Sequence, residues 1–129
     1  MFATGNLGAE GVGDMIQAHA LNRMTVLTAR KSTSDEWIEW GINNDVDHSV
    51  LGFVREFPQV LQGFEDVKDP KDNPYIHHPK RPTAACITPR SLEAASDILK
   101  LRDQYDDHTV TALLMGTIGD RGAMDMMAF

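Results

Sequence analysis

Residues 88–99 read TPRSLEAASDIL, and this stretch contains the clearest helix start in the chain. Thr88 is suited to the N-cap position, because its hydroxyl can accept a hydrogen bond from a free backbone N–H. Pro89 suits the first helical position, where no N–H is needed. Three apolar residues then recur at helical spacing: Leu92, Ala95 and Leu99. The stretch therefore predicts a helix with one face buried against neighbouring elements.

Further helices are predicted on both sides of this stretch. One carries Trp37, Ile38 and Trp40, with Ser32 or Ser34 as its cap. The next contains Val50, Leu51, Val54 and Phe57 and stops at Pro58. Downstream, a helix begins near Asp107 with Val110, Leu113, Leu114 and Ile118 facing inward, and a short Met-rich helix follows over residues 120–129. Residues 63–83 contain four prolines and many charges, so they predict an irregular loop.

The first thirty residues have a different pattern. Met1–Thr4 and Met24–Ala29 are short runs that predict strands, and a glycine-rich loop and a short helix over 14–21 lie between them. Two short strands form only a marginal sheet in water. The sequence therefore predicts that these strands pair with a partner or with a segment that precedes them.

Composition narrows the class of protein. The 129 residues are 42% hydrophobic and 24% charged, which is typical of a globular domain. The net charge of −7 argues against a general nucleic-acid binder. The single cysteine, Cys86, forms no internal disulfide and fits a reducing compartment. No apolar run reaches ~18 residues and no secretory signal is visible, so we expect a cytoplasmic protein without membrane contact.

The sequence does not favour a metal site or a known nucleophile motif. His77-His78, His48 and Cys86 lack the paired spacing of zinc ligands. Residues 43–47 begin like a calcium loop, but histidine follows where glycine is needed. Cys86 has apolar neighbours and is expected to be a small core residue. The glycine loop lacks the Gly-Lys-Ser/Thr ending of a P-loop, and no Gly-x-Ser-x-Gly elbow is present.

Three polar residues are candidates for chemistry. Asn6 follows a predicted strand, Arg23 ends a predicted short helix, and Arg90 lies in the first turn of the helix that Thr88 begins. A cation at that end opposes the helix dipole, but a helix N-terminus with an arginine suits a phosphate. Taken singly, the three residues also fit plain roles, as a turn-capping asparagine and two solvent-facing arginines.

Taken together, three short motifs resemble the second half of an AAA+ ATPase of the MoxR-like branch. They are Ala3-Thr4-Gly5-Asn6, Ala20-Leu21-Asn22-Arg23-Met24 and Thr88-Pro89-Arg90. They match, in order, the sensor 1 residue, the arginine-finger box and the sensor 2 arginine of that family. Asn22 and Met24 depart from the commoner Asp and Phe of the family. The family's Walker A and Walker B motifs would precede sensor 1, and this sequence contains neither.

The resemblance implies a mostly α fold with a short β element. Residues 1–31 would be the C-terminal edge of the α/β P-loop NTPase core, and residues 32–129 the helical lid. It also implies catalytic roles for Asn6 and Arg23 and a nucleotide contact for Arg90. The complete enzyme would use ATP and Mg²⁺, assemble as a homo-oligomeric ring and remodel a protein. The chain alone would be inactive.

Two other functions remain open. The first is a small helical interaction module without nucleotide chemistry, with the acidic middle segment, the proline-rich loop and the Met-rich tail as partner surfaces. Residues 32–75 hold ten acidic and three basic side chains. The second, less favoured by the residue spacing, is a metal-dependent enzyme.

Overall fold

The computed structural model describes residues 22–81 and 83–129. The chain divides into two compact units, Met1–Arg30 and Lys31–Phe129. The expected strand over Met1–Thr4, the glycine-rich loop and Asn6 lie outside the described residues. The expected strand over Met24–Ala29 is absent: residues 25–33 form neither helix nor strand. A strand needs a neighbour for its backbone N–H and C=O groups, and the described residues offer this segment no such partner.

The second unit is helical, as predicted. Its α-helices are α2 (Ser34–Asn43), α3 (His48–Glu56), α4 (Pro89–Lys100), α5 (Asp107–Ile118) and α6 (Asp120–Ala128). Short 3₁₀ helices occur at Pro58–Leu61, Phe64–Asp66 and Arg102–Gln104. The described residues contain no strand. The short β element of the predicted fold class is therefore not found among them.

Side-chain caps explain where four of these helices begin. Thr88 accepts a hydrogen bond from the Ser91 N–H at 3.0 Å, and Ser91 Oγ accepts one from the Thr88 N–H at 2.8 Å. The predicted cap and the proline that follows it are thus confirmed. The cap of α2 is Thr33, not Ser32 or Ser34 as expected. Asp47 and Asp106 cap α3 and α5.

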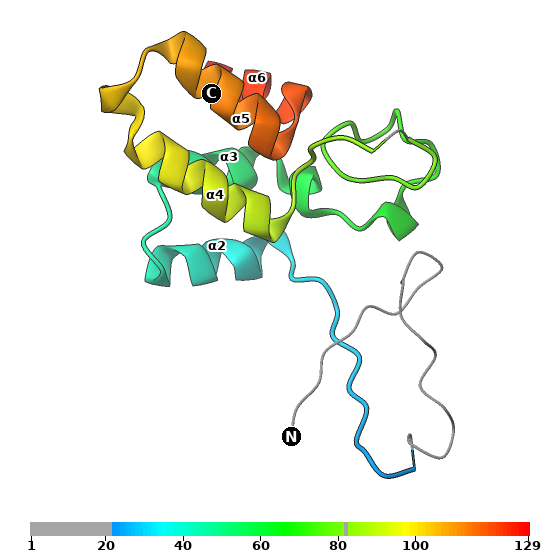
Figure 1. Ribbon diagram of the computed structural model, residues 1–129. Helices are drawn as coiled ribbons and strands as arrows, with labels where there is room; N and C mark the ends of the chain where they lie inside the picture. Colours follow the sequence, from blue (N-terminus) through cyan, green and yellow to red (C-terminus); the bar gives the residue numbers. More distant parts are fainter. Residues whose placement is uncertain (1–21, 82) are drawn as a thin grey trace. The chain divides into compact units, whose positions relative to one another are not determined.

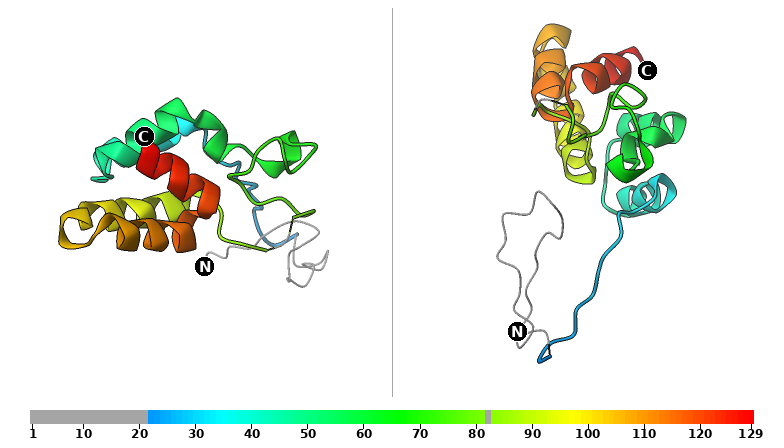
Figure 2. Two further views of the ribbon diagram at one scale, coloured as in Figure 1. Left: turned by 90° about the horizontal axis from the view of Figure 1, so that it is seen from above. Right: turned by 90° about the vertical axis from the view of Figure 1, so that its right-hand side faces the viewer.

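The helices pack as two groups joined by α3. The α2 helix contacts α3, while α4, α5 and α6 follow one another in contact (Figure 1). The α6 helix lies between α3 and the α4–α5 pair (Figure 2). The central buried residues are Val50, Phe53, Val54, Leu92, Ala95, Val110, Leu114 and Ile118. The predicted inward face of α4 is confirmed, but Leu113 of α5 is 45% exposed, contrary to expectation.

The connection between the second 3₁₀ helix and α4 is irregular over its described residues, 67–81 and 83–88. We call it the proline loop. The prediction of an irregular loop over 63–83 is thus confirmed for the described residues except Phe64–Asp66, which form the short 3₁₀ helix. Polar side chains hold it together: the Arg81 guanidinium donates hydrogen bonds to the carbonyl oxygens of Pro70, Asn73 and Pro74. The buried His78 ring contacts the Val67 carbonyl at 3.2 Å. Such bonds satisfy backbone groups that would otherwise need a helix or a sheet.

Candidate functional site

Arg90 lies in the first turn of α4, where the sequence predicts it, and its side chain is exposed. The capping box changes what that turn can bind. The Ser91 N–H is bonded to Thr88, and Pro89 has no N–H. The end of the helix therefore offers few free backbone donors. An anion here would be held chiefly by the Arg90 guanidinium.

Arg90 borders an open groove between α2 and α4, which we call the tryptophan groove. It has a volume of about 400 Å³. Its main lining residues are Glu36, Trp37, Trp40, Pro89, Arg90 and Glu93. Small-molecule sites in proteins commonly have volumes of ~300–1,000 Å³ and largely apolar walls with a few polar groups. The groove has both properties.

The two tryptophans of the groove differ in burial. Trp37 is 4% exposed and belongs to the core, whereas Trp40 is 41% exposed. Their ring centroids are 6.2 Å apart, with the planes inclined by 42°. The sequence predicts core or interface packing for both side chains, rather than base stacking in so acidic a segment. The exposed ring of Trp40 is the feature that sequence reasoning missed, and its spacing of four residues from Glu36 is the signal that could have placed both on one face of α2.

The charged groups at the groove are only partly engaged. Glu36 completes the cap of α2 by accepting a hydrogen bond from the Thr33 N–H at 2.9 Å. Within the described part of the chain, Arg90 and Glu93 form no ion pair within 4 Å, either with each other or with another residue. A guanidinium and a carboxylate thus border the groove without protein partners among those residues.

The structure gives no contact between Arg90 and the other two predicted site residues, Arg23 and Asn6. Arg23 is exposed in a turn of the first unit. Asn6 is outside the described residues. A common arrangement of the three residues therefore stays a prediction.

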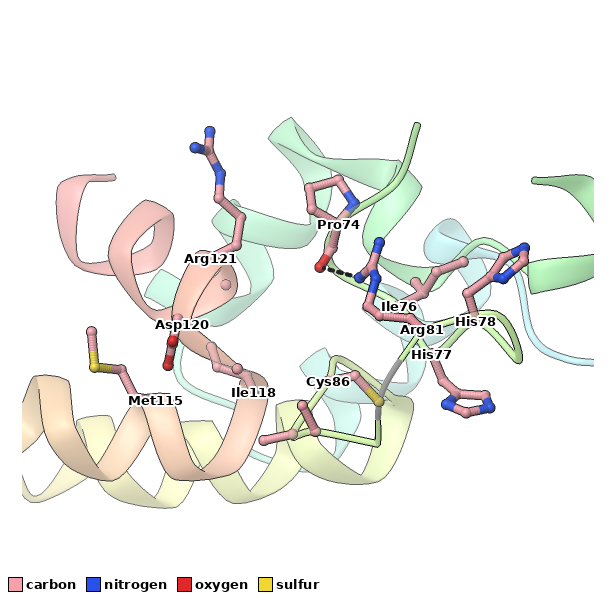
Figure 3. Close-up of a pocket in the computed structure, with 14 residues that line it drawn as sticks. Pro74, Ile76, His77, His78, Arg81, Cys86, Met115, Ile118, Asp120 and Arg121 are labelled. Carbon is pink, nitrogen blue, oxygen red and sulfur yellow. Dashed lines mark hydrogen bonds between the residues drawn. The ribbon is translucent and has the colours of Figure 1, made fainter. Parts of the chain in front are cut away.

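A second cavity, of about 260 Å³, lies between the proline loop and the α5–α6 turn (Figure 3). His77, His78, Arg81, Cys86 and Arg121 are among its lining residues. Arg81 is bonded to the carbonyls of the loop, and Arg121 donates a hydrogen bond to Asp125 at 2.7 Å. Both arginines are thus already bonded to other groups of the chain. Cys86, expected in the core, is instead half-buried at this cavity.

The described residues contain neither a cluster of metal ligands nor a helix that could span a membrane. Over residues 22–81 and 83–129, no three His, Cys, Asp or Glu side chains are grouped so that they could hold a metal ion. In the same part of the chain, no helix has the length and apolar character needed to cross a membrane.

Comparison with family models, curated proteins and solved structures found no match to this chain. The likeness to AAA+ ATPases therefore rests on the three sequence motifs. Of these motifs, Thr88-Pro89-Arg90 falls wholly on described residues and the second motif only at Asn22, Arg23 and Met24.

Proposed function

We propose that the chain is the C-terminal part of an AAA+ ATPase, with Lys31–Phe129 as its helical lid. One observation carries the proposal: Thr88-Pro89-Arg90 begins a capped helix, and Arg90 is exposed beside a groove without an ionic partner among the described residues. A fixed helix start holds the backbone of Arg90 in place, so its guanidinium can reach a phosphate that binds in front of it.

In this proposal Arg90 holds the nucleotide phosphates and couples their presence to closure of the lid. Arg23 stabilises charge on the transferring phosphoryl group, from a neighbouring subunit of a ring, and Asn6 orients the attacking water. The Mg²⁺ that accompanies ATP would be held mostly by the family's Walker motifs, which this sequence does not contain.

The genomic DNA upstream of Met1 provides the first test. An in-frame Gly-x-x-x-x-Gly-Lys-Ser/Thr motif there supports the proposal. In the protein that this frame encodes, Arg90→Ala should weaken ATP binding or abolish its coupling to hydrolysis. Arg90→Lys should rescue only partly, because lysine cannot form the bidentate contact.

Arg55→Ala is the matched control, because Arg55 is an exposed arginine in the last turn of α3 and does not line the groove. A fluorescent ATP analogue and a phosphate-release assay measure both steps. Equal affinity and equal turnover for the Arg90→Ala and wild-type proteins would reject the assignment of Arg90.

A helical interaction module is the second candidate. Exposed apolar side chains on α5 and α6, Leu113 and Met124, favour it. Large apolar groups on a surface suit contact with another protein. The absence of a Walker A motif upstream, together with a start signal at Met1, would favour this candidate over the ATPase.

A further inference from the structure

The tryptophan groove has features that a role for Arg90 alone does not explain. Trp40 is a large aromatic side chain, yet 41% of it is exposed, and the exposed ring borders the groove together with Pro89. Its ring centroid lies 6.2 Å from that of the buried Trp37. A flat, exposed aromatic surface suits stacking with another planar ring.

Besides Glu36, which caps α2, two charged groups of α4 line the groove. Arg90 and Glu93 are three residues apart on α4, so they lie on the same side of the helix. Both border the groove, and neither has an ionic partner among the described residues. A guanidinium binds phosphate oxygens, often through two parallel hydrogen bonds. A carboxylate accepts hydrogen bonds from ribose hydroxyls, as it does in dinucleotide-binding folds.

An aromatic surface, a guanidinium and a carboxylate around one groove form the recognition set for a nucleoside phosphate. We infer that the tryptophan groove binds the adenosine diphosphate portion of ATP. The adenine stacks on Trp40, the ribose hydroxyls donate hydrogen bonds to Glu93, and the phosphates contact Arg90. This inference deepens the proposed function, on which it rests, because it names the residues that hold the base and the sugar. An apolar peptide is the alternative occupant, and it would need neither charged group.

The test uses the 129-residue chain, with backbone amide signals followed by NMR during titration with ADP, adenosine or pyrophosphate. We expect saturable shifts around the groove with ADP at millimolar concentrations. Trp40→Ala should lower the affinity for ADP about tenfold, which corresponds to ~1.4 kcal/mol of stacking. The affinity for pyrophosphate should stay unchanged. Trp40→Phe should retain most of the affinity, because a phenyl ring still stacks.

The charged residues are tested with the same ligands. Arg90→Ala should lower the affinity for ADP and for pyrophosphate but not for adenosine. Glu93→Ala should lower the affinity for ADP but not for its 2′,3′-dideoxy analogue, which lacks the ribose hydroxyls. Ile42→Ala and Arg55→Ala are the controls: Ile42 is 63% exposed on α2, and neither residue lines the groove. Circular dichroism checks that each variant is folded.

Three results would overturn the inference: no shift with ADP, shifts that map away from the groove, or equal ADP affinity for wild type, Trp40→Ala and Trp40→Phe. The proposed function fails separately, through unchanged ATP turnover in the Arg90→Ala variant of the complete enzyme. A loss of turnover there with no effect of Trp40→Ala on ADP affinity would reject the groove and keep the ATPase.

Discussion

At the scale of single residues, Gly119 has the strictest requirement in the described part of the chain. It lies between α5 and α6 with φ of 84°, the left-handed region that glycine enters without strain. A Cβ atom at this position would lie 2.5 Å from the Ala85 carbonyl oxygen of the proline loop. The contact is with backbone, which cannot move aside as a side chain can. Both the backbone angle and the close approach therefore require glycine.

Gly119→Ala should lower the free energy of unfolding by at least ~2 kcal/mol, because strain and overlap add. Gly116→Ala is the control: Gly116 is in α5, and a Cβ there would meet nothing within 4 Å. Since alanine favours helices, this variant should be stabilised by up to ~1 kcal/mol. Chemical denaturation measures both values. Equal stability of the two variants would contradict the close approach at Gly119.

At the scale of elements, the start of α5 depends on one carboxylate. Asp106 Oδ1 accepts a hydrogen bond from the Thr109 N–H at 2.6 Å. That bond holds the pKa of Asp106 below its ordinary value of 3.8. A lowered pKa means that the charged carboxylate is favoured in the folded state. The stabilisation is therefore present above pH 3.8 and is lost as the pH falls through the folded-state pKa.

Asp106→Asn tests this cap, because asparagine also caps helices but does not titrate there. As the pH is lowered from about 5 to about 2.5, the melting temperature of wild type should fall more than that of Asp106→Asn. Asp97→Asn is the control, since Asp97 is exposed within α4 and caps no helix. A difference between wild type and Asp106→Asn that stays constant with pH would contradict the role of the charged cap.

A second link between elements joins the proline loop to α6. The buried Tyr75 hydroxyl donates a hydrogen bond to Asp125 Oδ2 at 2.7 Å, and Arg121 Nε donates one to the same oxygen at 2.7 Å. Burial, together with the bond to Asp125, raises the pKa of Tyr75 above its ordinary value of 10.0. A raised pKa favours the neutral phenol in the folded state. The stabilisation is therefore complete below about pH 10 and is lost as the pH rises above it.

Tyr75→Phe should lower the free energy of unfolding by ~1.5 kcal/mol at neutral pH, the contribution of a hydrogen bond to a charged group. The variant should also lose less stability than wild type as the pH rises above about 10, because it has no phenol to ionise. Tyr105→Phe is the matched control, because Tyr105 is exposed and its hydroxyl has no hydrogen-bond partner among the described residues. Denaturant titrations at about pH 7 and about pH 11 measure both effects. The same pH response in Tyr75→Phe and wild type would exclude Tyr75 as its source.

At the scale of the whole molecule, the 129-residue chain should hydrolyse no ATP. The sequence contains no Gly-x-x-x-x-Gly-Lys-Ser/Thr, so it lacks the loop and the lysine that hold the phosphates in P-loop enzymes. A phosphate-release assay with Mg²⁺ on the purified chain checks this. Turnover that survives a second purification would contradict the assignment of the chain as part of an ATPase.

Arg23 gives the corresponding prediction for the complete enzyme. Arg23→Ala should reduce hydrolysis by ~10³-fold or more with ATP affinity nearly unchanged, because an arginine finger acts on charge in the transition state. Mixing this variant with one inactivated at the Walker lysine should restore part of the activity if Arg23 acts on a neighbouring subunit. Failure of every mixture would exclude action across a subunit boundary.

What could be predicted from the sequence depends on local interactions. Thr88 and Pro89 determine where α4 begins, since a cap and a proline act within one turn. The spacing of Leu92, Ala95 and Leu99 likewise determines which face of α4 is buried. These local signals are sufficient to locate Arg90 at a helix start. The prolines and charges of residues 63–83 also exclude a long regular element there.

Packing between distant segments decided the rest. The α5 helix has apolar residues on both faces, so its sequence does not show that Leu114 faces the core while Leu113 faces outward. Trp37 and Trp40 have the same chemistry, and only the position of α4 beside α2 leaves one ring exposed at a groove. Met24–Ala29 has the composition of a strand but forms none among the described residues, because a strand requires a second segment. Caps and periodicity are properties of neighbouring residues, whereas exposure and pairing depend on which other parts of the chain lie alongside.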